Sequence, residues 1–154
     1  MTDALPVGDT KVRIVRLASG DMVAGHQAFL MLCDVFETPG DPLSDEYVAG
    51  LLGRSGMWVM VACDGDEIVG AVTAHELPMT RSESTELFIY DLAVRPEHQR
   101  RGIGRALIQR LLTDAAADGV DVAFVPADDE DIHALEFYTA LGGRPSPVTI
   151  FDFG

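Results

Sequence analysis

The strongest constraint on the fold is an apolar segment that leads through a glycine-containing turn into an amphipathic helix. Residues 86–94 (ELFIYDLAV) predict a strand. Residues 102–118 carry apolar side chains at helical spacing, and Gly102 and Gly104 lie at their start. A helix N-terminus presents free backbone N–H groups and the positive end of the helix dipole, and glycine lets an anion approach the backbone closely. The turn therefore predicts a site for a phosphate or pyrophosphate group.

Five of the eleven basic residues surround this turn: Arg95, Arg100, Arg101, Arg105 and Arg110. A solvated helix face is the ordinary interpretation of such a group, but its position beside the glycines favours an anionic ligand. The phosphate-loop pattern GxxxxGK[ST] is absent. The dinucleotide pattern GxGxxG also fails, because Leu107 stands where its third glycine belongs.

The overall charge is strongly acidic, with 25 Asp and Glu against 11 Lys and Arg and a formal net charge of −14. This balance argues against binding to nucleic acid or to a membrane surface, and it suits a cationic partner. The length of 154 residues predicts one domain, 10–154, after a flexible N-terminus, 1–9. We expect no signal peptide and no membrane span.

The remaining elements follow from periodicity and turn residues. Ser19 and Ser44 are candidate helix caps, and Asp64-Gly65-Asp66 predicts a hairpin turn. The order of elements predicts an α+β (mixed α/β) fold with about four helices and one mixed sheet, antiparallel in its N-terminal half and βαβ in its second half. The strands are expected at 11–16, 57–63, 67–77, 86–94, 120–125 and 148–153, and the helices at 19–36, 44–54, 102–118 and 132–141.

The cysteines and histidines do not indicate a metal or redox site. Cys33 and Cys63 show no CxxC spacing, so buried free thiols and a reducing, cytoplasmic location are expected. The four histidines have no ligand spacing such as HExxH, so no metal is predicted.

The pattern Gln99-x-x-Gly102-x-Gly104 after Leu92-Ala93-Val94 resembles the acetyl-coenzyme A motif of the GNAT superfamily of N-acetyltransferases. Further stretches look like the class I aminoglycoside 3-N-acetyltransferases, although Ile132-His133 and Phe153 depart from that pattern. These stretches are residues 88–94, Ala127-Asp128, residues 137–142 and Phe151-Asp152.

The resemblance implies roles for particular residues. Leu92, Ala93 and Val94 would pair with the pantetheine arm of acetyl-CoA as an added strand would. The N–H of Val94, freed by a bulge in its strand, would stabilise the oxyanion. Tyr138 would protonate the leaving thiolate, although it could equally be a core aromatic residue. The other coenzyme-binding residues would be Gln99, Arg100, Arg101, Gly102, Ile103, Gly104, Arg105 and Ala106.

The acceptor site is predicted from charge and strand alternation. In a regular strand Glu86, Phe88 and Tyr90 face one way, and Asp91 faces the other with Leu87 and Ile89. The general base stays open, and so does the question of whether there is one. The four acids at 128–131 could serve only to cap a helix. The candidate acceptor-binding residues are Glu83, Glu86, Tyr90, Asp128, Asp131 and Asp152.

These observations predict an acetyl-CoA-dependent N-acetyltransferase acting on a cationic amine, with the 3-amino group of an aminoglycoside (antibiotic resistance) as the first expectation. A polyamine, a metabolite amine or a protein N-terminus remain alternative acceptors, and a non-catalytic coenzyme A-binding module remains an alternative function. The closing segment Val148 to Phe153 is a candidate dimer element, because edge strands pair readily.

Overall fold

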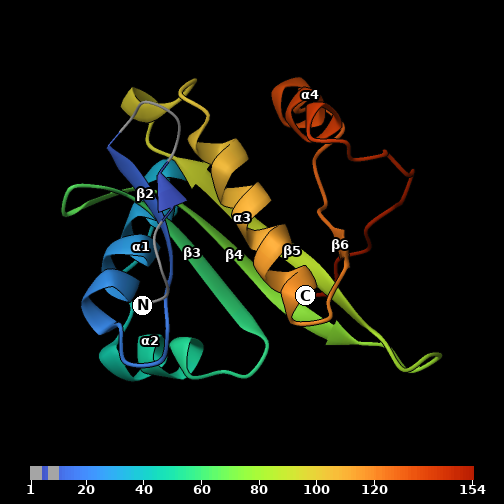
Figure 1. The fold of residues 1–154 in the computed structure, drawn as a ribbon, viewed down its shortest axis with the longest axis horizontal. Coiled ribbons are helices and arrows are strands. Elements are labelled where there is room, and N and C mark those ends of the chain that lie inside the picture. The colour runs from blue at the N-terminus through green and yellow to red at the C-terminus, as the bar shows by residue number, and fades with distance from the viewer. Residues whose placement is uncertain (1–4, 7–10) are drawn as a thin grey trace.

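The computed structural model describes residues 5–6 and 11–154, which form one mixed sheet and four α-helices (Figure 1). The predicted α+β class is confirmed. The strands are β1 Leu5–Pro6, β2 Val12–Arg16, β3 Met57–Asp64, β4 Glu67–Pro78, β5 Thr85–Val94 and β6 Val122–Phe124. The helices are α1 Met22–Val35, α2 Asp45–Leu52, α3 Ile103–Ala117 and α4 Ile132–Ala140, with a short 3₁₀ turn, η1, at Pro96–His98.

The sheet follows chain order from β1 to β6. Pairs up to β4–β5 are antiparallel, and β5–β6 is parallel. A parallel neighbour requires a crossover connection, and α3 supplies it. The predicted division into an antiparallel first half and a βαβ second half is therefore confirmed.

Each face of the sheet has its own apolar core. Helix α3 lies across one face over β3, β4 and β5 (Figure 1), and it buries Leu107 and Leu111 completely against Trp58 and Leu87. Helix α1 packs on the opposite face with Met31 against Val61. The sheet is thus fixed from both sides at the strands that lead to the glycine-containing turn.

Local signals located most elements well. Ser44 caps α2, with its hydroxyl oxygen accepting from the N–H of Tyr47 at 3.2 Å. The expected cap at Ser19 is wrong: α1 begins after Asp21, whose carboxylate accepts from the N–H of Ala18 at 2.7 Å. A left-handed Gly20, with φ of 94°, turns the chain between the two positions.

The expected closing strand at 148–153 is also wrong. The segment is apolar except at Thr149 and Asp152, but residues 148–153 form no strand in the described part of the chain. A strand needs a partner for its backbone groups, and apolar character does not supply one. The apolar side chains remain in solvent: Val148 is 75% exposed, Ile150 67%, Phe151 77% and Phe153 97%.

The expected flexible N-terminus, 1–9, lies outside the described residues except for Leu5 and Pro6, which pair with β2 at Ile14 and Arg13. It stays a prediction. No helix in the described part of the chain has the length and apolar character needed to cross a membrane.

Candidate functional site

Strands β5 and β6 pair over only three residues and then separate. Glu86, Leu87 and Phe88 pair with Val122–Phe124, and beyond them β6 turns away toward α4 (Figure 1). In the described ranges, the edge of β5 from Tyr90 to Val94 that faces away from β4 has no partner strand. An open backbone edge of this kind can accept an extended ligand as an added strand.

Alternation identifies the backbone groups that face this open edge. The N–H of Arg95 donates to the carbonyl of Val69 on the β4 side at 2.8 Å. Because peptide groups of successive residues in a strand point to opposite sides, the N–H groups of Leu92 and Val94 point away from β4. The carbonyl of Val94 accepts from the side-chain amide of Gln99 at 3.0 Å. Two N–H groups and the Leu92 carbonyl are therefore presented at the open edge.

A β-bulge at Tyr90 changes which side chains share a face. Thr73 pairs with Asp91 and Ala74 with Ile89, so Tyr90 is the extra residue, and the N–H of Asp91 donates to the Thr73 hydroxyl at 3.2 Å. Before the bulge Leu87 and Ile89 face the α3 core, whereas after it Leu92 and Val94 do. Asp91 therefore faces away from α3, and its predicted position on the face of Leu87 and Ile89 is wrong.

A bulge in this strand was expected to free the N–H of Val94; the strand contains a bulge, but it lies at Tyr90 and not beside Val94. Tyr90 is the bulged residue, and Val94 is regularly paired with Gly70 on the β4 side. The N–H of Val94 is exposed by the separation of β5 from β6 instead.

The first turn of α3 is open to an anion. Its N-cap is Gly102, in the left-handed region at φ of 79°, and no side chain caps it, whereas Ser44 caps α2 and Asp131 caps α4. Its first turn also carries no acidic residue. The N–H groups that begin α3 and the positive end of its dipole are thus available.

The five arginines divide into two groups. Arg100, Arg101 and Arg105 are exposed, and within the described part of the chain their side chains make no ion pair. Arg110 instead donates to Asp114 at 2.9 and 3.0 Å, and Arg95 lies between two carboxylates of the protein. Three arginines remain available for an anionic ligand, and two are used within the fold.

Tyr138 lies half-buried on α4, close to the start of α3. Its neighbour Phe137 contacts Gly104, where an added Cβ would lie 3.4 Å from the phenyl ring, and the Phe137 and Tyr138 rings meet edge to face at 5.1 Å. Burial raises the pKa of Tyr138 above its usual value of 10.0, and the nearby negative charge of Asp131 raises this pKa further. The phenol is therefore protonated at neutral pH and can serve as a proton donor.

Asp91 is a candidate base that the sequence analysis left out. Partial burial raises the pKa of its carboxyl above 3.8, and His75 opposes that shift. A carboxylate with a raised pKa accepts a proton more readily than an exposed one. The signal in the sequence was an aspartate inside an otherwise apolar strand, but regular alternation placed it on the wrong face.

Aromatic rings connect the three strands near Asp91. Phe88 stacks on Phe124 at 5.1 Å and meets Tyr90 edge to face at 5.5 Å, and Tyr90 meets His75 at 5.8 Å. Tyr90 is 61% exposed and Phe124 42%. We refer to these four residues as the aromatic strip; the faces of its Phe and Tyr rings attract cationic groups.

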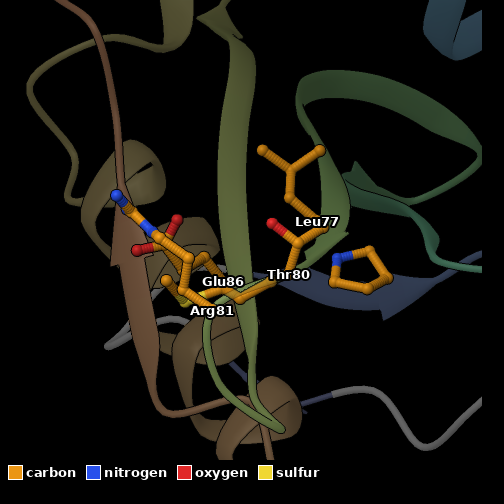
Figure 2. Close-up of a pocket in the computed structure, with 6 residues that line it drawn as sticks. Leu77, Thr80, Arg81 and Glu86 are labelled. Atoms are coloured by element: carbon orange, nitrogen blue, oxygen red, sulfur yellow. The ribbon is translucent and has the colours of Figure 1, made fainter.

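Glu86 lines a pocket of about 410 Å³ at the end of the β4–β5 hairpin. Figure 2 shows Arg81 and Glu86 on one side of this pocket and Leu77 on the other. Glu83 is exposed in the nearby connection between β4 and β5. Arg81 was not expected here, and it places a positive charge beside the predicted acceptor residues.

The other predicted acceptor residues lie in a different part of the chain. Asp131 caps α4 by accepting from the N–H of Ala134 at 3.0 Å, and Asp128 accepts from the N–H of Glu130 at 2.9 Å. Asp152 is exposed near the C-terminus. Among the described residues, no hydrogen bond or ion pair links these three to Glu83, Glu86 or Tyr90, and their common role stays a prediction.

Cys33 and Cys63 are free thiols, as expected, but both are only partly buried. Burial raises the pKa of Cys63, against the opposing effect of Arg13. Among residues 5–6 and 11–154, no three His, Cys, Asp or Glu side chains are grouped so that they could hold a metal ion.

Comparisons with known proteins agree with this geometry. The model of the acetyltransferase (GNAT) family matches residues 27–142. A crystal structure of an aminoglycoside acetyltransferase from an uncultured soil metagenomic sample, in complex with sisomicin, is 32% identical with a TM-score of 0.88, covering 93% of this chain and 95% of that one. The same type of enzyme in complex with trehalose superposes with a TM-score of 0.90 at 32% identity, over 95% of this chain and 97% of that one.

Curated relatives match over shorter regions. Mycothiol acetyltransferase of Corynebacterium glutamicum is 39% identical over 58% of this chain and 28% of its own length. The ribosomal protein bS18 alanine N-acetyltransferase of Escherichia coli is 32% identical over 41% of this chain and 43% of its own length. The matched region thus spans less than half the length of these relatives.

The titration of Tyr138 tests the electrostatics of the site. We expect its phenol to titrate above pH 10 in the folded protein, because burial and Asp131 both disfavour the phenolate. Asp131→Asn should lower this pKa partway, since asparagine keeps the helix cap but removes the charge. NMR of ring-labelled tyrosine, assigned with Tyr138→Phe, measures it. Identical titration of Tyr138 in both proteins would contradict the role of Asp131.

Proposed function

Since the chain belongs to the acetyltransferase (GNAT) family, we propose that it transfers an acetyl group from acetyl-CoA to an amine of a cationic small molecule, specifically the 3-amino group of an aminoglycoside. The observation that carries the acceptor class is the 32% identity to an aminoglycoside acetyltransferase over nearly the full length of both chains. The assignment of the 3-amino position rests on the resemblance of residues 88–94 and 137–142 to the class I enzymes.

The residues present fit acetyl-CoA. The uncapped N-terminus of α3 suits a pyrophosphate, and the exposed Arg100, Arg101 and Arg105 add positive charge beside it. The open edge of β5 at Leu92–Val94 suits the amide-containing pantetheine arm. The other coenzyme-binding residues we propose are Gln99, through its bond to the Val94 carbonyl, and the backbone of Gly102–Ala106.

Acetyl-CoA supplies the acetyl group as an activated thioester. The amine nitrogen attacks the carbonyl carbon, and negative charge develops on the carbonyl oxygen. The N–H of Val94 points to the open edge and can donate to this oxygen. Because this donor belongs to a strand that β4 holds in place, it needs little reorganisation during the reaction.

Two side chains transfer protons: one accepts a proton from the amine, and the other donates a proton to the sulfur. Asp91 accepts the proton that the amine must lose, directly or through one water, and partial burial makes it a stronger base than an exposed carboxylate. Tyr138 donates its phenolic proton to the departing sulfur, and its raised pKa keeps that proton available at neutral pH.

The acceptor would approach over the aromatic strip. Ammonium groups bind favourably to the faces of aromatic rings, and Glu83 and Glu86 add negative charge at one end. Asp128 and Asp131 at the start of α4, and the exposed Asp152, would add further negative charge. The net charge of −14 raises the encounter rate with a polycation.

An acceptor panel with thiol-release detection tests the proposed function. We expect coenzyme A release with aminoglycosides, and NMR of the product should place the acetyl group on the 3-amino nitrogen. Turnover only with a polyamine, a metabolite amine or an N-terminal peptide would contradict the proposed aminoglycoside acceptor but support N-acetyl transfer. Thermal protection by coenzyme A without any turnover would indicate a binding module instead.

The pH dependence separates the two proton-transfer residues. In the wild type, kcat/KM for the acceptor should rise with pH as Asp91 loses its proton, at a pH above the ordinary carboxyl value of 3.8. Asp91→Asn should lower the rate by about 10²- to 10⁴-fold and leave the KM for acetyl-CoA nearly unchanged.

Tyr138→Phe should also lower kcat but keep the acidic limb of the profile, because Asp91 remains. Tyr47→Phe, an exposed tyrosine on α2, is the matched control and should behave as wild type. Full activity of either active-site variant would contradict its assigned role.

We also propose a homodimer formed through the closing segment 148–153. This segment offers four exposed apolar side chains without a strand partner, and Val122 and Phe124 of edge strand β6 are 53% and 42% exposed. Residues 143–154 carry one Arg and one Asp, so two chains of charge −14 could meet there with little repulsion.

Light scattering should give twice the chain mass of 16.6 kDa. Ile150→Lys should restore the single-chain mass, because it places a charge within the segment that would pair. A single-chain mass for the wild type would contradict the dimer.

A further inference from the structure

The turn between β3 and β4 carries negative charge directly beside the segment that leads into α3. Asp64, Asp66 and Glu67 lie in or next to this two-residue turn, which we call the acidic turn. Opposite it stand Arg95, the residue that follows β5, and His98, the last residue of η1. The proposed coenzyme loop, Gln99–Gly104, begins immediately after His98.

Two ion pairs of Arg95, and one contact of His98 that becomes an ion pair when the imidazole is protonated, join these parts. His98 Nε2 lies 3.5 Å from Asp64 Oδ2, Arg95 Nε lies 3.8 Å from Glu67 Oε1, and Arg95 Nη2 lies 3.9 Å from Asp34 Oδ2 on α1. The side chain of His98 is 13% exposed and that of Arg95 28%. Solvent therefore screens the side chains of Arg95 and His98 less than it screens the exposed Arg100 and Arg101 of the loop.

Two buried nitrogen atoms show that apolar packing does not explain these residues. Arg95 Nε and His98 Nδ1 are buried, and no hydrogen-bond partner for them is found in the described part of the chain. A buried N–H without a partner costs free energy, and an apolar side chain of similar size would avoid that cost. Positioning of the segment through the carboxylate pairs would account for polar side chains here despite that cost.

Backbone hydrogen bonds transmit this position to the loop. The N–H of Arg95 bonds to Val69 on β4 at 2.8 Å, and the N–H of His98 bonds back to the Arg95 carbonyl at 2.8 Å. Gln99 follows at once and donates to the Val94 carbonyl, next to the open edge of β5. A displacement of η1 would move Gln99 and the left-handed Arg100 that starts the turn into α3.

We propose that Arg95 and His98 are positioning residues for the coenzyme site: their pairs with the acidic turn and Asp34 fix η1, and so set the backbone of Gln99–Gly104 for the pyrophosphate of acetyl-CoA. The inference rests on the proposed function. It assigns to the acidic turn a role in the affinity for the coenzyme.

Removal of charge from the acidic turn tests the inference, because positioning and long-range electrostatics predict opposite changes in the affinity for coenzyme A. Asp64→Asn and Glu67→Gln make the protein less negative, so long-range electrostatics alone would strengthen binding of the anionic coenzyme. Loss of positioning predicts the reverse: a rise of about threefold to thirtyfold in the Kd for coenzyme A and in the KM for acetyl-CoA. The kcat and the KM for the acceptor should stay near wild type.

Variants on the basic side extend this test. Arg95→Gln and His98→Gln should raise the Kd for coenzyme A by a similar factor, and Arg95→Lys should restore most of the affinity. Asp64→Asn added to His98→Gln should have little further effect, because the pair is already broken. Calorimetric titration measures Kd in the full chain, and steady-state kinetics separates KM from kcat.

His26→Gln is the matched control. His26 pairs with Asp45 at 2.8 Å between α1 and α2, away from the coenzyme loop, so its replacement should leave the Kd unchanged. Unchanged or tighter coenzyme binding by Asp64→Asn and Glu67→Gln, whose side chains are 40% and 61% exposed, would overturn the inference. No binding of coenzyme A by the wild type would instead overturn the proposed function.

Discussion

The separation of β5 from β6 is the constraint on which the site depends. A parallel sheet normally satisfies the backbone groups of both strands along their length. Here the pairing stops at Phe88 and Phe124, and the next part of β5 presents its N–H groups to an open edge. The same chain then passes through η1 into the uncapped N-terminus of α3. A ligand with an extended amide arm and an anionic end matches both features.

The bulge at Tyr90 gives this edge its chemical character. One extra residue turns Asp91 away from the α3 core, and leaves Leu92 and Val94 packed against that core. Without the bulge, Asp91 would face α3 among apolar side chains, where its charge would be expensive to bury. The one extra residue in β5 therefore places the candidate base on the face of the sheet that carries the exposed aromatic strip.

Much of the fold could be predicted from the sequence because its signals are local. The hairpin turn at Gly65-Asp66, the Ser44 cap and the periodicity of residues 102–118 each act within a few residues. The bulge was missed because it depends on how β4 and β5 pair. The alternation of side chains along one strand carries no information about that pairing. The strand expected at 148–153 failed for a related reason, since a strand requires a partner that an apolar sequence alone does not identify.

The positions of charged residues could be read from the sequence, but their partners in the fold could not. The cluster of five arginines could be seen in the sequence, but not that Arg95 and Arg110 belong to ion pairs within the fold. The acids after β6 were weighed as helix caps or as ligands for a cationic acceptor. Asp131 is a cap, and its charge also raises the pKa of Tyr138. Its negative charge thus supports a proton donor at neutral pH whether or not an acceptor is bound. An acidic side chain in this region can therefore act in two separate ways, as a helix cap through its oxygen atoms and on the pKa of a neighbouring phenol through its charge.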